Sequence, residues 1–124
     1  MFVIGKEFSF SSAHQLFDLP KGHKCGVLHG HNYTIELILV SDILDETGFV
    51  VDYGNLSFIK DWIDNNLDHR NLNDVFDFQT SAEKIAQALF FTFKLMINQK
   101  YPKILLQEVV VSETPKTFAS YRGN

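Results

Sequence analysis

The fold of this chain is decided by residues 29–40, which read His29-Gly30-His31-Asn32-Tyr33-Thr34-Ile35-Glu36-Leu37-Ile38-Leu39-Val40. From Tyr33 onward the odd positions are aromatic or aliphatic, and polar side chains hold the even positions as far as Glu36. This period of two predicts a β-strand with one buried face. His29 and His31 share the parity of that face, so both imidazoles are expected at one end of it.

The first residues of the chain predict a second strand, from Phe2 to about Ser11, because apolar residues recur there at period two with one interruption at Lys6. The same parity reaches His14, although a bulge at residues 11–13 would re-aim that side chain. Residues 15–28 between the two strands form a long loop, and long ordered loops in small domains are often functional.

The second half of the chain predicts two helices and more strands. Residues 45–48 form a turn, and residues 49–51 are expected to pair back as a short strand. Residues 54–66 carry a helical apolar period, and residues 67–74 are a polar loop. A capping box, Thr80-x-x-Glu83, opens a second helix that ends near Asn98.

Two further strands, 104–113 and 117–122, are joined by a turn at residues 115–116. The order of elements predicts one α+β domain over residues 1–124, in which two helices cover one face of an antiparallel sheet.

Composition narrows the class of protein. The chain has 124 residues, a net charge of −4 and scattered basic residues, which argues against a nucleic-acid-binding surface. It contains no apolar run of about 18 residues that would predict a membrane span, and its first residues do not resemble a signal peptide. A single cysteine favours a reducing cytoplasm. The 12 phenylalanines suggest that other subunits cover part of the apolar surface.

His29 and His31 are candidate metal ligands, because two imidazoles on one strand face need a third ligand to make an open zinc site. Alone, the pair also suits two polar residues at the start of a strand. His14 can supply the third nitrogen from the neighbouring strand. His23 is a rival third ligand, but it lies in the glycine-containing loop.

Cys25 is either a small buried apolar residue or a reactive thiol. It lies in a polar loop beside Lys24 and close to the candidate metal ligands, and cationic neighbours favour the thiolate.

Two further positions carry candidate chemistry. Asp68 and His69 could form a proton-carrying pair, or His69 could simply interact with a helix C-terminus. Glu113 ends an apolar strand face, where it could accept two adjacent N–H groups of a ligand, such as those on the 2-amino-4-oxo edge of guanine or a pterin. It could equally be a solvated glutamate before a turn.

Together these segments resemble the 6-pyruvoyltetrahydropterin and 6-carboxytetrahydropterin synthase family over nearly the whole chain. The segments that carry the resemblance are Phe10 to His14, Gly22 to Tyr33, Gly48 to Tyr53, Leu67 to Asn73, Ser81 to Glu83 and Val111 to Thr114. Gln79-Thr80-Ser81 departs from the family's more usual proline and threonine.

The resemblance implies a tunnelling fold with a four-stranded antiparallel sheet, closed into a barrel by three subunits, with two trimers stacked as a homohexamer and sites between subunits. It implies one Zn²⁺ per subunit on His14, His29 and His31. It also implies roles for other residues: Cys25 as the base, Asp68 and His69 as its proton relay, and Glu113, Ser81 and Ala82 as contacts to the pterin.

The activity that the resemblance implies is conversion of 7,8-dihydroneopterin triphosphate to 6-carboxy-5,6,7,8-tetrahydropterin, acetaldehyde and triphosphate, a step of queuosine biosynthesis. The alternative within the family is 6-pyruvoyltetrahydropterin synthase, which eliminates triphosphate without loss of the side chain. More distant alternatives are a non-catalytic pterin- or metal-binding module and a cupin-type metal enzyme. The two expected helices argue against a cupin.

Overall fold

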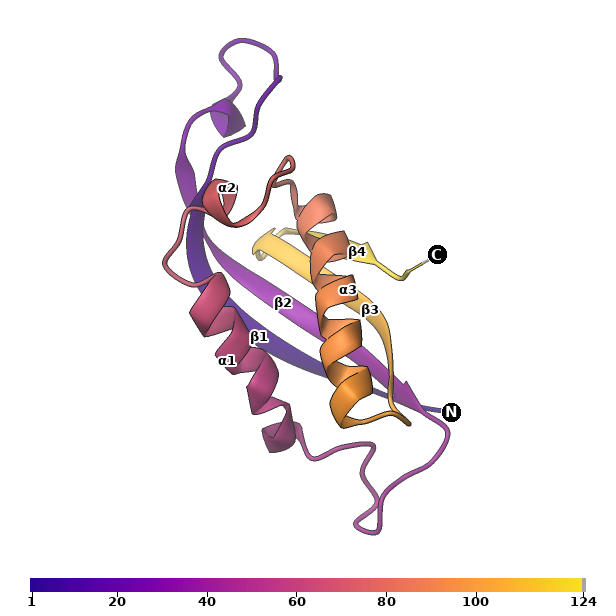
Figure 1. The fold of residues 1–124 in the computed structure, drawn as a ribbon. Coiled ribbons are helices and arrows are strands. Elements are labelled where there is room, and N and C mark those ends of the chain that lie inside the picture. Colours follow the sequence, from indigo (N-terminus) through magenta and orange to yellow (C-terminus); the bar gives the residue numbers. More distant parts are fainter. Residues whose placement is uncertain (124) are drawn as a thin grey trace.

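Two long strands form the centre of the fold. β1 (Phe2–His14) and β2 (His29–Ser41) pair antiparallel over their full length in the computed structural model, which describes residues 1–123 (Figure 1). Their register is continuous from Phe2 opposite Ser41 to His14 opposite His29. The bulge considered at residues 11–13 does not interrupt this pairing, so His14 keeps the parity of the buried face.

Two further strands complete the sheet. β3 (Leu105–Thr114) pairs with β2, and β4 (Thr117–Tyr121) pairs with β3, so the strand order is β1-β2-β3-β4. Every neighbouring pair is antiparallel. The predicted α+β class and four-stranded antiparallel sheet are confirmed.

The two main helices, α1 (Ser57–Asn66) and α3 (Ala82–Lys100), lie on the same face of the sheet (Figure 1). A 3₁₀ turn (Tyr53–Leu56) leads into α1, and a second one (Lys24–Gly26) lies in the loop between β1 and β2. The helices bury an apolar stripe against the core-facing side chains of β1, β2 and β3. The largest wholly or almost wholly buried side chains include Tyr33, Ile35, Leu37, Leu39, Ile59, Ile63, Leu89 and Phe93. None of the helices in residues 1–123 combines the length and apolar character needed to cross a membrane.

Residues 49–51 do not form the predicted strand. The carboxylate of Asp45 accepts hydrogen bonds from the backbone N–H groups of Thr47 and Phe49, each at 2.9 Å, and Asp45 N–H donates to the Phe49 carbonyl at 2.8 Å. The turn therefore closes on itself, and Val51 is buried without joining a strand.

The start of α3 also differs from the prediction. Ser81, not Thr80, caps this helix, because its hydroxyl accepts from the backbone N–H of Lys84 at 3.3 Å. Thr80 is completely buried one residue earlier. A short helix, α2 (Leu72–Val75), occupies the end of the segment predicted as a polar loop, and it is capped by Asn71.

Candidate metal centre and active site

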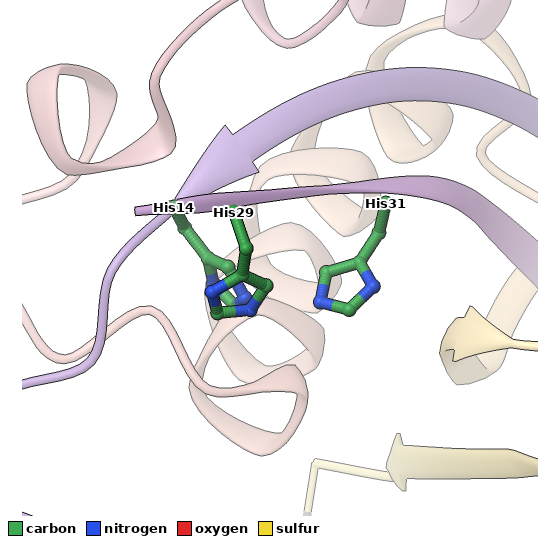
Figure 2. Close-up of side chains that lie close together, drawn as sticks. All are labelled: His14, His29 and His31. Carbon is green, nitrogen blue, oxygen red and sulfur yellow. The ribbon is translucent and has the colours of Figure 1, made fainter. Parts of the chain in front are cut away.

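Three histidines meet at the end of the β1–β2 hairpin. The strand register places His14 opposite His29 and Ser12 opposite His31, and side-chain alternation then turns all three imidazoles to one face. Figure 2 shows the three rings on the same side of the two strands. Their ring centroids are 4.6 to 5.2 Å apart, and one nitrogen from each lies within 4.8 Å of the others.

Backbone carbonyls orient two of these rings. His14 Nδ1 lies 2.8 Å from the Thr80 carbonyl, and His29 Nδ1 lies 2.7 Å from the Val27 carbonyl. Because a carbonyl only accepts hydrogen bonds, each Nδ1 carries a proton, and in the neutral ring the Nε2 lone pair is free. Metal-binding histidines are usually held in this way.

The Nε2 atoms of all three histidines are shielded from solvent and lack a hydrogen bond. Unpaired buried polar atoms are costly, and a shared cation would satisfy all three at once. The residues therefore fit a divalent metal ion held by three imidazoles.

A carboxylate lies against the same cluster. Glu113 Oε2 is 3.1 Å from His14 Nε2 and 3.3 Å from His31 Nε2, although neither contact has the alignment of a hydrogen bond. The contact with His14 is the main cause that lowers the pKa of Glu113, ahead of the opposing effect of burial. Burial lowers the pKa of His31, although Glu113 opposes this shift. Near neutral pH, Glu113 is therefore ionised and His31 neutral, and neutral imidazole is the form that binds metals.

His23, the rival third ligand, lies outside the histidine cluster. Its Nδ1 accepts a hydrogen bond from the backbone N–H of Cys25 at 3.0 Å and so helps to shape the loop. Among the residues that the structure describes, His14 is the histidine that joins His29 and His31.

Cys25 lies in the middle of the 3₁₀ turn of the loop between β1 and β2, and it is half-buried. This loop projects beyond the end of the sheet (Figure 1). The backbone carbonyl of Cys25 accepts a hydrogen bond from the backbone N–H of Leu16 at 3.0 Å, which ties the turn to the start of the loop. The thiol is not part of the metal-ligating group of the described residues.

Asp68 and His69 lie beside the free edge of β1. Asp68 Oδ1 accepts from the backbone N–H of Ser11 at 2.9 Å, and the backbone N–H of His69 donates to the Ser11 carbonyl at 2.7 Å. His69 Nδ1 lies 2.8 Å from Asp68 Oδ2. His69 has a positive φ of 57°, and its side chain is 84% exposed. The carboxylate thus fixes the orientation of an imidazole that faces outward from this subunit.

The sequence from residue 3 to residue 124 matches the family model described as 6-pyruvoyl tetrahydropterin synthase. The chain belongs to this family.

Curated relatives in the family carry two different activities in their names. The chain is 30% identical to a 6-carboxy-5,6,7,8-tetrahydropterin synthase of Bacillus subtilis, an alignment that spans 98% of this chain and 85% of the relative. It is 32% identical to a 6-pyruvoyl tetrahydrobiopterin synthase of Drosophila melanogaster, over 93% of this chain and 76% of the relative.

The fold agrees with solved structures of the family. The structure of Caenorhabditis elegans 6-pyruvoyl tetrahydropterin synthase superposes with a TM-score of 0.84 at 28% identity, covering 99% of this chain and 96% of that one.

The sequence analysis did not assign a role in the histidine cluster to three residues that contact it. The carbonyls of Thr80 and Val27 orient histidines, but any residue has a carbonyl, so nothing in the sequence marks them. Tyr33 stacks on Phe10 with ring centroids 4.8 Å apart, and its buried hydroxyl lacks a hydrogen-bond partner. Its sequence signals were its parity with His31 and its place at the end of the segment Gly22 to Tyr33, and neither assigned it a role in the site.

Ser81 and Ala82 lie directly after Thr80 at the start of α3. Ala82 is buried, whereas Ser81 is partly exposed and its hydroxyl caps the helix. The carbonyl of Thr80 brings this helix start to the histidine cluster.

Asp68 should make the free energy of unfolding decrease as the pH is lowered into the acid range. The hydrogen bond from Ser11 N–H is the first cause that lowers its pKa, followed by the contact with His69. A carboxylate whose pKa is lowered by folding stabilises the fold above its unfolded pKa of about 3.9. This contribution is lost as the pH falls through the folded pKa.

We therefore expect Asp68→Asn to lower the free energy of unfolding at pH 7 and to differ less from the wild type below about pH 4. Urea unfolding of both proteins at several pH values measures this difference. A difference that is constant from pH 7 to pH 3 would contradict it. Asp64→Asn is the control, since Asp64 makes only an exposed contact with Lys60.

Proposed function

We propose that this protein converts 7,8-dihydroneopterin triphosphate to 6-carboxy-5,6,7,8-tetrahydropterin, acetaldehyde and triphosphate, in a zinc-dependent step of queuosine biosynthesis. The observation that carries the proposal is the cluster of three histidines with free, buried Nε2 atoms. The Bacillus subtilis relative, which is aligned with almost the whole chain, supports the carboxylated product.

His14, His29 and His31 would hold one Zn²⁺ per subunit, since imidazole nitrogens are among the preferred ligands of zinc and three of them leave a coordination position open. Zinc bound there supplies Lewis acidity toward the hydroxyl and ketone oxygens of the substrate side chain. The carbonyls of Thr80 and Val27 hold two of the rings by Nδ1, which would leave their Nε2 atoms available to the metal.

Glu113 would position the substrate. An ionised carboxylate accepts two parallel N–H bonds, which the 2-amino-4-oxo edge of a pterin presents. The side chain of Glu113 is 27% exposed beside the histidine cluster, which supports this role because a bound ligand can reach it. The backbone at Ser81 and Ala82 would add contacts to the ring. Positioning of this kind brings the reacting carbon close to the catalytic groups.

Cys25 would act as the base that takes a proton from the substrate side chain, and His69, oriented by Asp68, would return protons elsewhere on the chain. The 2.8 Å contact between His69 and Asp68 supports the relay, since a carboxylate fixes the imidazole tautomer. Relocation of these protons would tautomerise the ring system and allow triphosphate to leave, and cleavage of the side chain would then consume one water molecule.

The sites would lie between subunits of a homohexamer built from two trimers, in the cytoplasm. Three features support assembly. β1 and β4 are the edges of the sheet, and the backbone groups of an edge strand can pair with another chain. On β1, the residues after α1 already bond the backbone of Ser11 and Ala13, so pairing would involve the earlier part of the strand. His69 is largely exposed, so a neighbouring subunit can bring substrate against it. Several large apolar side chains are also exposed, among them Phe2, Phe17, Phe49, Phe91, Leu95 and Phe118.

Product analysis tests the proposed reaction. We expect the purified, zinc-loaded protein to convert 7,8-dihydroneopterin triphosphate to a carboxylated tetrahydropterin together with acetaldehyde, as measured by mass spectrometry and an aldehyde assay. The Drosophila relative supports the alternative, 6-pyruvoyltetrahydropterin synthase, for which a pyruvoyl product without acetaldehyde is expected. Binding without conversion would instead favour a non-catalytic pterin-binding module.

A further inference from the structure

Glu113 reaches the metal centre from a different strand than the histidines. It lies near the end of β3, two residues after the buried Val111 and on the same face. Its side chain is 27% exposed. The carboxylate therefore approaches the imidazole cluster from the side of the third strand, where it can also reach a ligand in solution.

The distances suit a metal ligand. Two ligands that bind one tetrahedral zinc ion at about 2.0 to 2.1 Å are separated from each other by about 3.3 Å. Glu113 Oε2 lies 3.1 Å from His14 Nε2 and 3.3 Å from His31 Nε2. Neither nitrogen has a hydrogen bond, so the oxygen stands beside both atoms at the separation expected of co-ligands.

We infer that the Glu113 carboxylate supplies the fourth metal ligand while no pterin is bound, and that it leaves the metal to hold the pterin ring. The second part of this inference, that Glu113 exchanges the metal for the pterin ring, rests on the proposed function. It follows because a carboxylate that accepts two parallel N–H bonds must turn both oxygens toward the pterin edge. Oε2 would then lose its present position beside the Nε2 atoms of His14 and His31.

This exchange would couple substrate binding to the opening of the site. Structural zinc sites are closed by four protein ligands, whereas catalytic sites keep one position open. With Glu113 in place the site is closed, and water cannot take the fourth position. Arrival of the pterin ring removes the carboxylate and opens that position beside the substrate side chain.

A competing explanation predicts the opposite effect on metal affinity. The carboxylate could serve only as a counter-ion for protonated imidazoles in the metal-free protein. It would then stabilise the metal-free state and compete with the metal. Removal of its charge would leave metal affinity unchanged or increase it.

The first test measures Zn²⁺ and Co²⁺ affinity of pterin-free protein by competition with a chromophoric chelator. We expect Glu113→Gln to weaken binding at least about tenfold, because loss of even an outer-shell partner costs ten- to hundredfold. The matched control is Glu108→Gln, which removes a carboxylate of the same strand that pairs with Arg122 at 3.4 Å. Unchanged or tighter binding by Glu113→Gln would overturn the assignment. Circular dichroism establishes that both variants are folded.

The second test follows the visible spectrum of the Co²⁺-loaded protein on addition of 6-methylpterin, which has the ring but no side-chain hydroxyls. We expect the wild-type spectrum to move toward that of Glu113→Gln, and the variant's own spectrum to stay unchanged. Equilibrium dialysis measures how much 6-methylpterin is bound. If the pterin is bound and the wild-type spectrum does not change, the exchange is overturned. Failure of 6-methylpterin to bind would count against both the exchange and the proposed function. The metal affinities of the first test do not involve a pterin, so they test the fourth ligand independently.

Discussion

The Cys25→Ala variant is expected to keep its bound metal and to lose about 100- to 10,000-fold in turnover, the usual contribution of a positioned acid or base. Its metal content should not change, because Cys25 does not belong to the group of described residues, His14, His29 and His31, that could hold a metal ion. The fold should also persist, since Cys25 is only half-buried, in a loop that projects beyond the sheet. Steady-state kinetics and metal analysis of the purified variant measure both effects.

A second substitution separates chemistry from packing. Cys25→Ser restores most of the side-chain volume but cannot form a thiolate, so it should be as slow as Cys25→Ala. Full activity in Cys25→Ala would show that another group is the base. Recovery of activity in Cys25→Ser would show that the thiol matters for its shape and not for its proton chemistry.

The His29→Ala variant is expected to lose at least about 100-fold in metal affinity and, with the metal, essentially all turnover, because a direct ligand contributes more than an outer-shell partner. His29 begins β2, is only partly buried, and is held by the Val27 carbonyl. Its removal should therefore leave the hydrophobic core intact, unlike removal of the fully buried His14. Metal content after dialysis against a weak chelator is the measurement.

His23→Ala is the matched control for this prediction. His23 belongs to the loop that leads into β2, but it contacts the backbone of Cys25 and stands outside the metal-ligating group. We expect His23→Ala to keep one equivalent of metal. Stoichiometric metal in His29→Ala, or its loss only in His23→Ala, would show that the ligand set is wrong.

Much of the fold could be predicted from local pattern. Alternation from Tyr33 to Leu39 and from Phe8 to Phe10 marks strands whose inner residues are buried in the structure. These predictions succeed because a half-buried strand and an amphipathic helix each impose a fixed period on the sequence. The prediction of a strand at residues 49–51 was wrong, because the carboxylate of Asp45 bonds backbone N–H groups that a strand would otherwise pair.

The helix start at residues 80–81 shows a second limit of local pattern. Thr80 and Ser81 both suit a capping position by residue type. In the structure Ser81 caps the helix, whereas Thr80 is buried and its carbonyl accepts from Nδ1 of His14, 66 residues away in sequence. A contact between such distant residues leaves no periodic signal in either segment.

The sequence by itself determined that His29 and His31 share one strand face, because side-chain parity is a local property of an extended chain. It left the face of His14 open, and the continuous register of β1 and β2 placed it with the other two. The sequence also determined that Asp68 and His69 are neighbours and that the one thiol lies in the loop before β2. Only the tertiary structure decided that His14 stands opposite His29, that two carbonyls hold the imidazoles, and that Glu113 meets His14 and His31. These features depend on strand register and on main-chain atoms common to all residues, so they become visible only when distant segments pack together.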